Sequence, residues 1–102
     1  METSFQIILN AGNARSSAME AIAFAKEGNF DEANQKLEDA KKEISDAHHF
    51  QTDLIHAEAR GESIDMNVIL VHAQDHLMTA MVVKDMAIEF VELYEKFAEL
   101  KK

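Results

Sequence analysis

The chain of 102 residues contains no cysteine, no proline and no tryptophan, and only three glycines. Without cysteine it can form no disulfide, no thiolate metal site and no cysteine nucleophile, which fits a reducing compartment. Without proline, and with so little glycine, it lacks the residues that most often interrupt helices, while alanine, glutamate, lysine, leucine and methionine are abundant. The composition therefore predicts an all-α protein.

Basic residues are also scarce, since 10 lysines and arginines stand against 19 aspartates and glutamates and the formal net charge is -9. Binding to nucleic acid or to an acidic membrane surface needs a concentrated basic face. We therefore expect protein or small-molecule partners and no nucleic acid. The chain also lacks an apolar span of about 18 residues and a basic region ahead of its first apolar run, so we expect a cytoplasmic protein without secretion signal or membrane insertion.

The length and a hydrophobic content of 47% indicate one domain, residues 1–102, with a modest core. Helical periodicity predicts helices over residues 3–27, 30–60 and 65–100, separated by glycine-containing breaks. Short connections of this kind predict an antiparallel, up-down-up bundle of three helices. In the first segment the apolar positions and the glycine that recur at helical spacing are Phe5, Ile8, Leu9, Gly12, Met19, Ile22 and Ala23.

The second segment begins with a capping signal and carries a regular apolar seam. Asn29 is expected to cap the helix, and Asp31 and Glu32 favour the positive end of its dipole. The seam positions follow spacings of 4, 3, 4, 3, 4 and 3 and are Ala33, Leu37, Ala40, Ile44, Ala47, Gln51 and Leu54. Gln51 stands where an apolar residue is expected, so it either sets the register or oligomeric state, or is a core amide with satisfied hydrogen bonds.

The third segment has two apolar faces, whereas a helix in a three-helix bundle needs only one. At 100° per residue, the face suited to packing on the other helices contains Leu70, Ala73, Leu77, Ala80, Met81, Ile88 and Val91. The second stripe, on roughly the opposite side, contains Val68, Val71, Met78, Val82 and Met86. A second apolar face predicts a covering surface, and we expect that surface to be another subunit.

Asp75 falls within this second stripe. If an interface buries the carboxylate, its charge must be paired, protonated or bound to a metal. In a cyclic oligomer, copies of Asp75 would recur around the axis and repel one another unless a hard cation such as Mg²⁺ drew them together. The alternative is an ordinary carboxylate at the solvated rim of the stripe.

His72 and His76 are four residues apart and share one helical face. The pair suits zinc binding, acid–base catalysis, or nucleophilic catalysis in which an imidazole nitrogen accepts a phosphoryl group. Alternatively, both histidines are structural residues whose hydrogen bonds are satisfied in a core or an interface. The protease motif H-E-x-x-H is excluded because Ala73 occupies the glutamate position, and another zinc site would have to recruit Asp75 or further histidines.

Gln74, Thr79 and Arg15 are the other polar residues to consider around His72 and His76. Gln74 lies two positions after His72 and points nearly away from it, so it could act only across a subunit boundary. Donors such as His76 or Thr79 would have to stabilise a phosphoryl group, because the net charge opposes an incoming dianion. Arg15 is one of only two arginines, and a surface salt bridge is its expected role.

Four stretches together are similar to one protein family. They are FQIILNAGNARSSAMEA, AKEGNFDEA, AHHFQTDLI and VHAQDHLMTAM, in this order and across nearly the whole chain. The chain resembles the enzyme IIA component of the lactose/cellobiose (chitobiose) class of the bacterial phosphoenolpyruvate-dependent sugar phosphotransferase system. VHAQDHLM is the specific stretch. AKEGNFDEA is also typical of tetratricopeptide-like hairpins, so a non-enzymatic helical adaptor is the alternative function.

The resemblance implies a cytoplasmic phosphocarrier that assembles as a homotrimer of three-helix subunits. His72 matches the family's phosphorylated histidine, which receives phosphate from phospho-HPr and passes it to a cysteine of the cognate enzyme IIB during uptake of a disaccharide such as cellobiose. Asp75 matches the family's metal-binding residue at the trimer axis, where Mg²⁺ or a similar divalent cation is expected. His76 and Gln74 are expected to neighbour the phosphoryl group. Because the chain lacks cysteine, it cannot itself be the IIB component.

Overall fold

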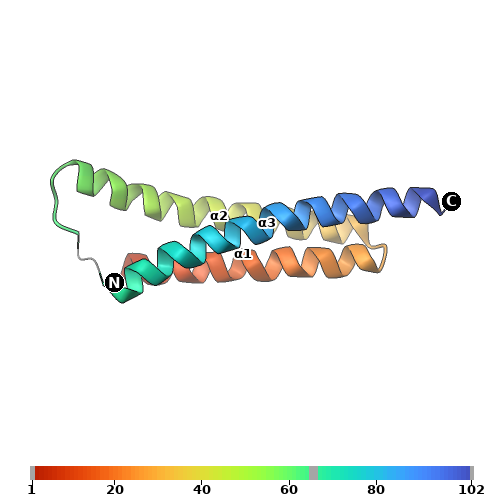
Figure 1. Cartoon of the computed structure of the whole chain (residues 1–102), viewed down its shortest axis with the longest axis horizontal. Coiled ribbons are helices and arrows are strands. Elements are labelled where there is room, and N and C mark those ends of the chain that lie inside the picture. Colours follow the sequence, from red (N-terminus) through yellow and green to blue (C-terminus); the bar gives the residue numbers. More distant parts are fainter. Residues whose placement is uncertain (1, 65–66, 102) are drawn as a thin grey trace.

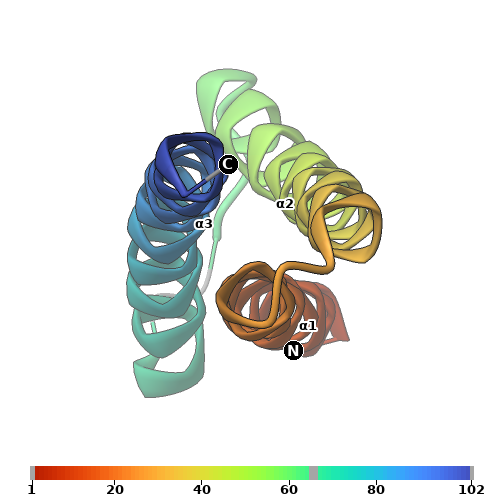
Figure 2. The ribbon, with the colours of Figure 1, turned by 90° about the vertical axis from the view of Figure 1, so that its right-hand side faces the viewer.

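The protein, seen in a computed structural model that describes residues 2–64 and 67–101, is a bundle of three long helices (Figure 1). They are α1 (Glu2–Lys26), α2 (Phe30–Ala59) and α3 (Val68–Leu100), and the described residues contain no strand. The bundle measures 60 × 20 × 16 Å, and the view along its length shows the helices at the corners of a triangle (Figure 2). The predicted all-α, up-down-up architecture is confirmed.

Glycines end both α1 and α2 in the same way. Gly28 and Gly61 have φ values of 83° and 86°, a conformation that a side chain disfavours. After α1, the amide of Asn29 donates to the carbonyl of Phe24 and that of Gly28 donates to Ala25. The same pair of bonds recurs around Gly61, so both ends are Schellman motifs that satisfy the last carbonyls of a helix.

The helix starts differ from the predictions in two details. Asn67 is extended, and its side chain accepts a hydrogen bond of 2.8 Å from the amide of Leu70, so α3 begins at Val68. The predicted start at Asp65 lies outside the described residues. Asn29 does occupy the cap position of α2, but within the described chain its side chain makes no capping hydrogen bond, so the predicted side-chain cap is wrong.

Alanines form most of the buried face of α1. The buried residues are Ser4, Ile7, Ala11, Ala14, Ala18, Ala21 and Ala25, at spacings of three and four. The apolar positions singled out from the sequence lie largely elsewhere, since Phe5, Leu9 and Met19 are each more than half exposed. Small side chains let neighbouring helices approach closely, so α1 packs mainly through its alanines, while Ile8 and Ile22 are half-buried at the edge of the core.

The other two helices bury the predicted faces. Along α2 the seam residues Ala33, Leu37, Ala40, Ile44 and Ala47 are buried, and Gln51 and Leu54 are half-buried. Along α3 the buried residues are Leu70, Ala73, Leu77, Ala80, Ala87 and Val91. Together with α1 they form two successive core clusters, one near the start of α3 and one near its end.

The second apolar stripe of α3 is uncovered. Its residues, Val68, Val71, Met78, Val82 and Met86, are 51 to 84% exposed. The stripe continues to the end of the helix through Phe90, Leu93, Phe97 and Leu100, which are also exposed. In Figure 1 the last turns of α3 extend beyond the turn between α1 and α2. The prediction of two apolar faces on α3 is confirmed. No helix in the described part of the chain is long and apolar enough to cross a membrane.

The alanine face of α1 generates a testable prediction. Ala14 is fully buried and Ala23 is exposed on the same helix, so replacing each by leucine adds the same atoms to a packed and to an open position. We expect Ala14→Leu to lower the free energy of unfolding by about 1–3 kcal/mol, because the added carbons overpack the core. Ala23→Leu should change it by less than about 0.5 kcal/mol. Urea denaturation followed by circular dichroism measures both, and equal effects would refute the assignment of the buried face.

Candidate functional site

The two histidines of α3 stand side by side at the surface. Their rings are stacked, with centroids 5.8 Å apart and planes only 8° from parallel. The spacing of four residues produces this arrangement, because side chains at i and i+4 lie one above the other on a helix. His72 is exposed and His76 is half-buried, so a partner protein can reach His72 without any rearrangement of the bundle.

His76 lies against α1 at Gly12. A Cβ atom built on Gly12 would lie 3.6 Å from Nε2 of His76, an ordinary van der Waals distance, so the ring lies directly beside this glycine. Beside this contact is a surface hollow of about 560 Å³ lined by Gly12, Arg15, Ser16, Met19, Glu20 and His76. His76 is therefore placed in the groove between α3 and α1, and His72 is stacked on it one turn earlier on α3.

Arg15 lines this hollow without an ion-pair partner among the residues that the structure describes. Glu20, the carboxylate in the same hollow, faces Lys36 of α2 at 3.6 Å instead. The other arginine, Arg60, is paired with Glu62 at 2.7 Å. The expected surface salt bridge of Arg15 is thus wrong. Its position beside His76 was missed because sequence spacing within one helix does not give the register between two helices; the only available signals were the rarity of arginine and the glycine three residues before it.

Asp75 is exposed on the second apolar stripe of α3. The described residues of a single chain contain no group of three or more histidine, aspartate or glutamate side chains that could hold a metal ion. Asp75 has the carboxylate oxygens that Mg²⁺ prefers, but one carboxylate supplies only a small part of about six oxygen ligands. These residues fit a metal only if further copies of the chain, or water, complete the coordination.

Gln74 points toward α2 rather than toward His72. Its Oε1 accepts a hydrogen bond of 2.6 Å from Nε2 of Gln51, the polar residue in the seam of α2. Of the two interpretations of Gln51, the structure shows the satisfied amide, and its partner is a residue of the candidate stretch. This hydrogen bond joins two half-buried amides of α2 and α3, and Gln74 directly precedes Asp75 in the sequence.

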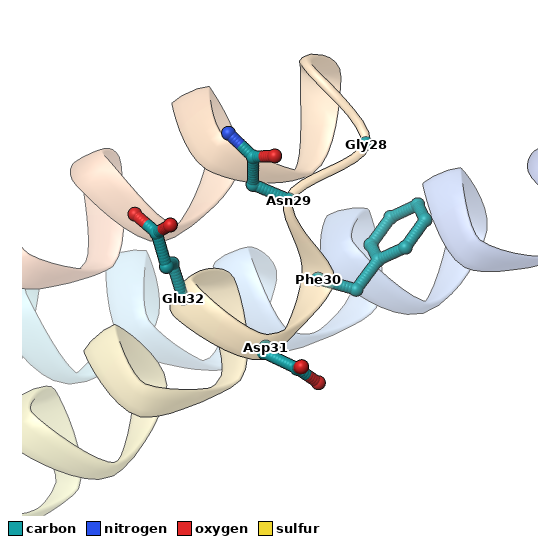
Figure 3. Close-up of a pocket in the computed structure, with 5 residues that line it drawn as sticks. All are labelled: Gly28, Asn29, Phe30, Asp31 and Glu32. Atoms are coloured by element: carbon teal, nitrogen blue, oxygen red, sulfur yellow. The ribbon is translucent and has the colours of Figure 1, made fainter.

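The remaining histidines and the turn between α1 and α2 offer no comparable site. His48, His49 and His56 are exposed on α2, and the described residues do not bring them into a metal-binding group with the pair on α3. A hollow of about 380 Å³ at the turn is lined by residues 28–32. In Figure 3 its side chains diverge, and Phe30 points toward α3, where it packs on the core.

Comparison with known proteins gives the family. The family model described as the PTS system, lactose/cellobiose specific IIA subunit, matches residues 2–95. The lichenan-specific phosphotransferase enzyme IIA component of Bacillus subtilis is 64% identical over 95 residues, which cover 93% of this chain and 86% of that protein.

Two solved structures have the same fold. The cellobiose-specific enzyme IIA of Bacillus anthracis superposes with a TM-score of 0.93 at 55% identity, covering 96% of this chain and 90% of that chain. The IIA(chitobiose) of Escherichia coli, solved in complex with HPr, superposes with a TM-score of 0.83 at 37% identity, covering 95% of this chain and 94% of that chain. With a family model that spans almost the whole length, the chain belongs to the lactose/cellobiose-specific IIA family of the sugar phosphotransferase system.

Proposed function

We propose that this IIA protein is a phosphoryl-transfer intermediate that accepts phosphate from phospho-HPr on His72 and passes it to the cysteine of the cognate enzyme IIB. The observation that carries the proposal is the exposed His72 ring, mounted on a rigid helix and stacked on His76. The similarity to an IIA protein solved in complex with HPr supports HPr as the donor. A carrier that exchanges phosphate with HPr acts in the cytoplasm.

The transfer step needs little beyond positioning. A lone pair on a ring nitrogen of His72 forms the new bond to phosphorus, while the bond between phosphorus and the donor atom of HPr breaks and its electron pair returns to that donor. In the next step the thiolate sulfur of enzyme IIB attacks the same phosphorus, and the electron pair of the nitrogen–phosphorus bond returns to His72. The imidazole is restored after each cycle, so no oxidant, reductant or further reactant is consumed.

His76 and Gln74 are proposed as neighbours of the phosphoryl group with different access to it. The ring of His76 lies parallel to that of His72 on the same side of α3, so a ring N–H can donate to a phosphoryl oxygen. Gln74 is bonded to Gln51 on the α2 side, and its NH₂ group keeps its donors because its Oε1 is the acceptor in that bond. Gln74 therefore acts, in this proposal, only on the phosphoryl group of an adjacent subunit.

We propose that the protein is a homotrimer in which the uncovered stripe of each α3 faces the axis. Asp75 and the nine exposed apolar residues of α3 form one series from Val68 to Leu100 with spacings of 3, 4, 3, 4, 4, 4, 3, 4 and 3. The average spacing lies between the 3.5 residues of a left-handed coiled coil and the 3.6 of a straight helix. Such a series supports long, nearly straight contact between copies of α3.

Asp75 is the one charged position in this series, and rotational symmetry would bring its copies to the same level of the axis. We propose that Mg²⁺ or a similar divalent cation is held there by Asp75 of the three subunits. The ion would offset the repulsion between the carboxylates. Water molecules would complete its coordination, as is usual for Mg²⁺.

The transported sugar is proposed to be a disaccharide such as cellobiose. Support comes from the names of related proteins, among them the cellobiose-specific enzyme IIA of Bacillus anthracis at 55% identity and the lichenan-specific IIA component of Bacillus subtilis at 64% identity. In this proposal the IIA protein contributes phosphate rather than sugar specificity, which belongs to the membrane component.

The phosphorylation site is tested with a matched pair of histidine variants. Incubation with phosphoenolpyruvate, enzyme I and HPr should add one acid-labile phosphoryl group to the protein, and mass spectrometry should locate it on His72. His72→Ala should remove the modification, whereas His49→Ala, which truncates an exposed histidine on α2, should leave it unchanged. Phosphorylation of His72→Ala to the parent level would refute the assignment.

The proposed assembly is tested by sedimentation. The parent protein should sediment as a trimer, and Val82→Glu should shift it toward monomer, because a charge would be buried in the middle of the stripe. Ser45→Glu adds the same charge to the exposed surface of α2 and should leave the oligomeric state unchanged. A monomeric parent protein at all concentrations would contradict the proposal.

The proposed metal site predicts a difference between the parent protein and Asp75→Leu. Removal of divalent cations with EDTA should weaken the parent trimer, because the carboxylates then repel one another. Asp75→Leu should assemble at least as strongly as the parent protein and should not respond to EDTA. An EDTA effect of equal size on both proteins would place the cation elsewhere.

Sugar uptake tests the proposed substrate. A strain that lacks the gene for this protein should lose uptake of cellobiose, and the parent gene should restore it while a His72→Ala gene should not. Undiminished cellobiose uptake in the deletion strain would exclude this sugar.

A further inference from the structure

The hollow beside His76 contains one arginine and one glutamate, and the glutamate is directed to a different partner. The chain carries a formal charge of -9, yet this hollow contains an arginine that no carboxylate of the described residues neutralises. Glu20 could have paired with Arg15, but it is directed to Lys36. An arginine without an ion-pair partner, placed beside a pair of histidines, is suited to an anionic ligand.

The hollow brings together three side chains that can donate hydrogen bonds to an oxyanion. The ring of His76 lies beside Gly12 at the edge of the hollow, and Arg15 and Ser16 follow one turn further along α1. A guanidinium presents several N–H donors in a planar fork, a hydroxyl adds another, and an imidazole N–H can add a third group. Phosphoryl oxygens are the acceptors that such a set binds best, because arginine can contact two of them at once.

We propose that Arg15, with Ser16 and His76, binds the phosphoryl oxygens of phosphorylated His72 in the groove between α1 and α3. The inference rests on the proposed function of His72 and adds the group that offsets the charge of the dianion. Arg15 is exposed and shares the hollow with His76, whose ring stacks on that of His72. Arg15 is thus assigned to phosphoryl binding rather than to a structural ion pair.

The site favours the phosphorylated state of the carrier. A guanidinium that contacts the phosphoryl oxygens stabilises phosphorylated His72 relative to the free imidazole, so it shifts the equilibrium of phosphate between HPr and this protein. It also stabilises the dianion relative to the monoanion, which lowers the pKa of the phosphoryl group itself. A purely structural arginine would do neither.

The test compares Arg15→Gln with Arg15→Lys and with Arg60→Gln, a control that removes the other arginine of the chain. Each protein is mixed with phospho-HPr, and the ratio of the two phosphorylated proteins is measured at equilibrium, because a docking defect changes only the rate at which this ratio is reached. We expect Arg15→Gln to lower the equilibrium constant about tenfold, which corresponds to about 1.4 kcal/mol. Arg15→Lys should lose less, and Arg60→Gln should match the parent protein.

Phosphorus NMR gives a second measurement on the same samples. The pKa of the phosphoryl group on His72 should be higher in Arg15→Gln than in the parent protein and unchanged in Arg60→Gln. The NMR signal of the Arg15 side chain should shift when His72 is phosphorylated and not when inorganic phosphate is added at equal concentration to the unphosphorylated protein.

Four outcomes would overturn the inference. Parent and Arg15→Gln proteins that are phosphorylated at His72 with equal equilibrium constants would leave the proposed function intact and remove Arg15 from it. Equal losses in Arg15→Gln and Arg60→Gln would indicate a general charge effect. An equal response of Arg15 to inorganic phosphate would indicate a free-anion site. If the parent protein took no phosphate at His72, the proposed function would fail as well, so the two failures are distinguishable.

Discussion

Helix α3 packs on the rest of the bundle through one apolar face and leaves a second apolar face uncovered, and the candidate site depends on this division. Leu70, Leu77 and Val91 anchor the helix in the core, so its orientation about its own axis is fixed. That orientation places His76 at the groove toward α1, the exposed His72 beside it, and Asp75 on the uncovered stripe. A rotation of α3 by one residue would bury a charge and expose the core, so the positions of the polar residues follow from packing.

The sequence predicted those features that depend on one helix at a time. Both helix ends at Gly28 and Gly61 were predicted because glycine tolerates the left-handed conformation that a Schellman motif needs. The two faces of α3 and the seam of α2 were predicted because helical spacing alone determines which residues share a face. The parallel His72 and His76 rings belong to the same class, since a separation of four residues is enough to stack them.

Features that depend on two helices were not predictable in this way. Helix α1 carries both an alanine face and a face with larger apolar residues, and hydrophobicity alone favours the larger ones. The alanine face is buried because it lets α1 approach α2 and α3 closely, which is a property of the pair of helices. The Gln51–Gln74 hydrogen bond and the position of Arg15 beside His76 likewise depend on the register between helices. The start of α3 at Val68 has a local cause instead, because the side chain of Asn67 caps the helix.

The central claim is that His72 carries phosphate between two other proteins, and transfer in a single turnover tests it most directly. The protein is phosphorylated, separated from HPr and mixed with the cognate enzyme IIB, and both proteins are followed by mass spectrometry. Phosphohistidine at His72 should disappear at the rate at which phosphocysteine appears on enzyme IIB. Phosphate that stays on His72 while enzyme IIB is phosphorylated by another route would contradict the claim.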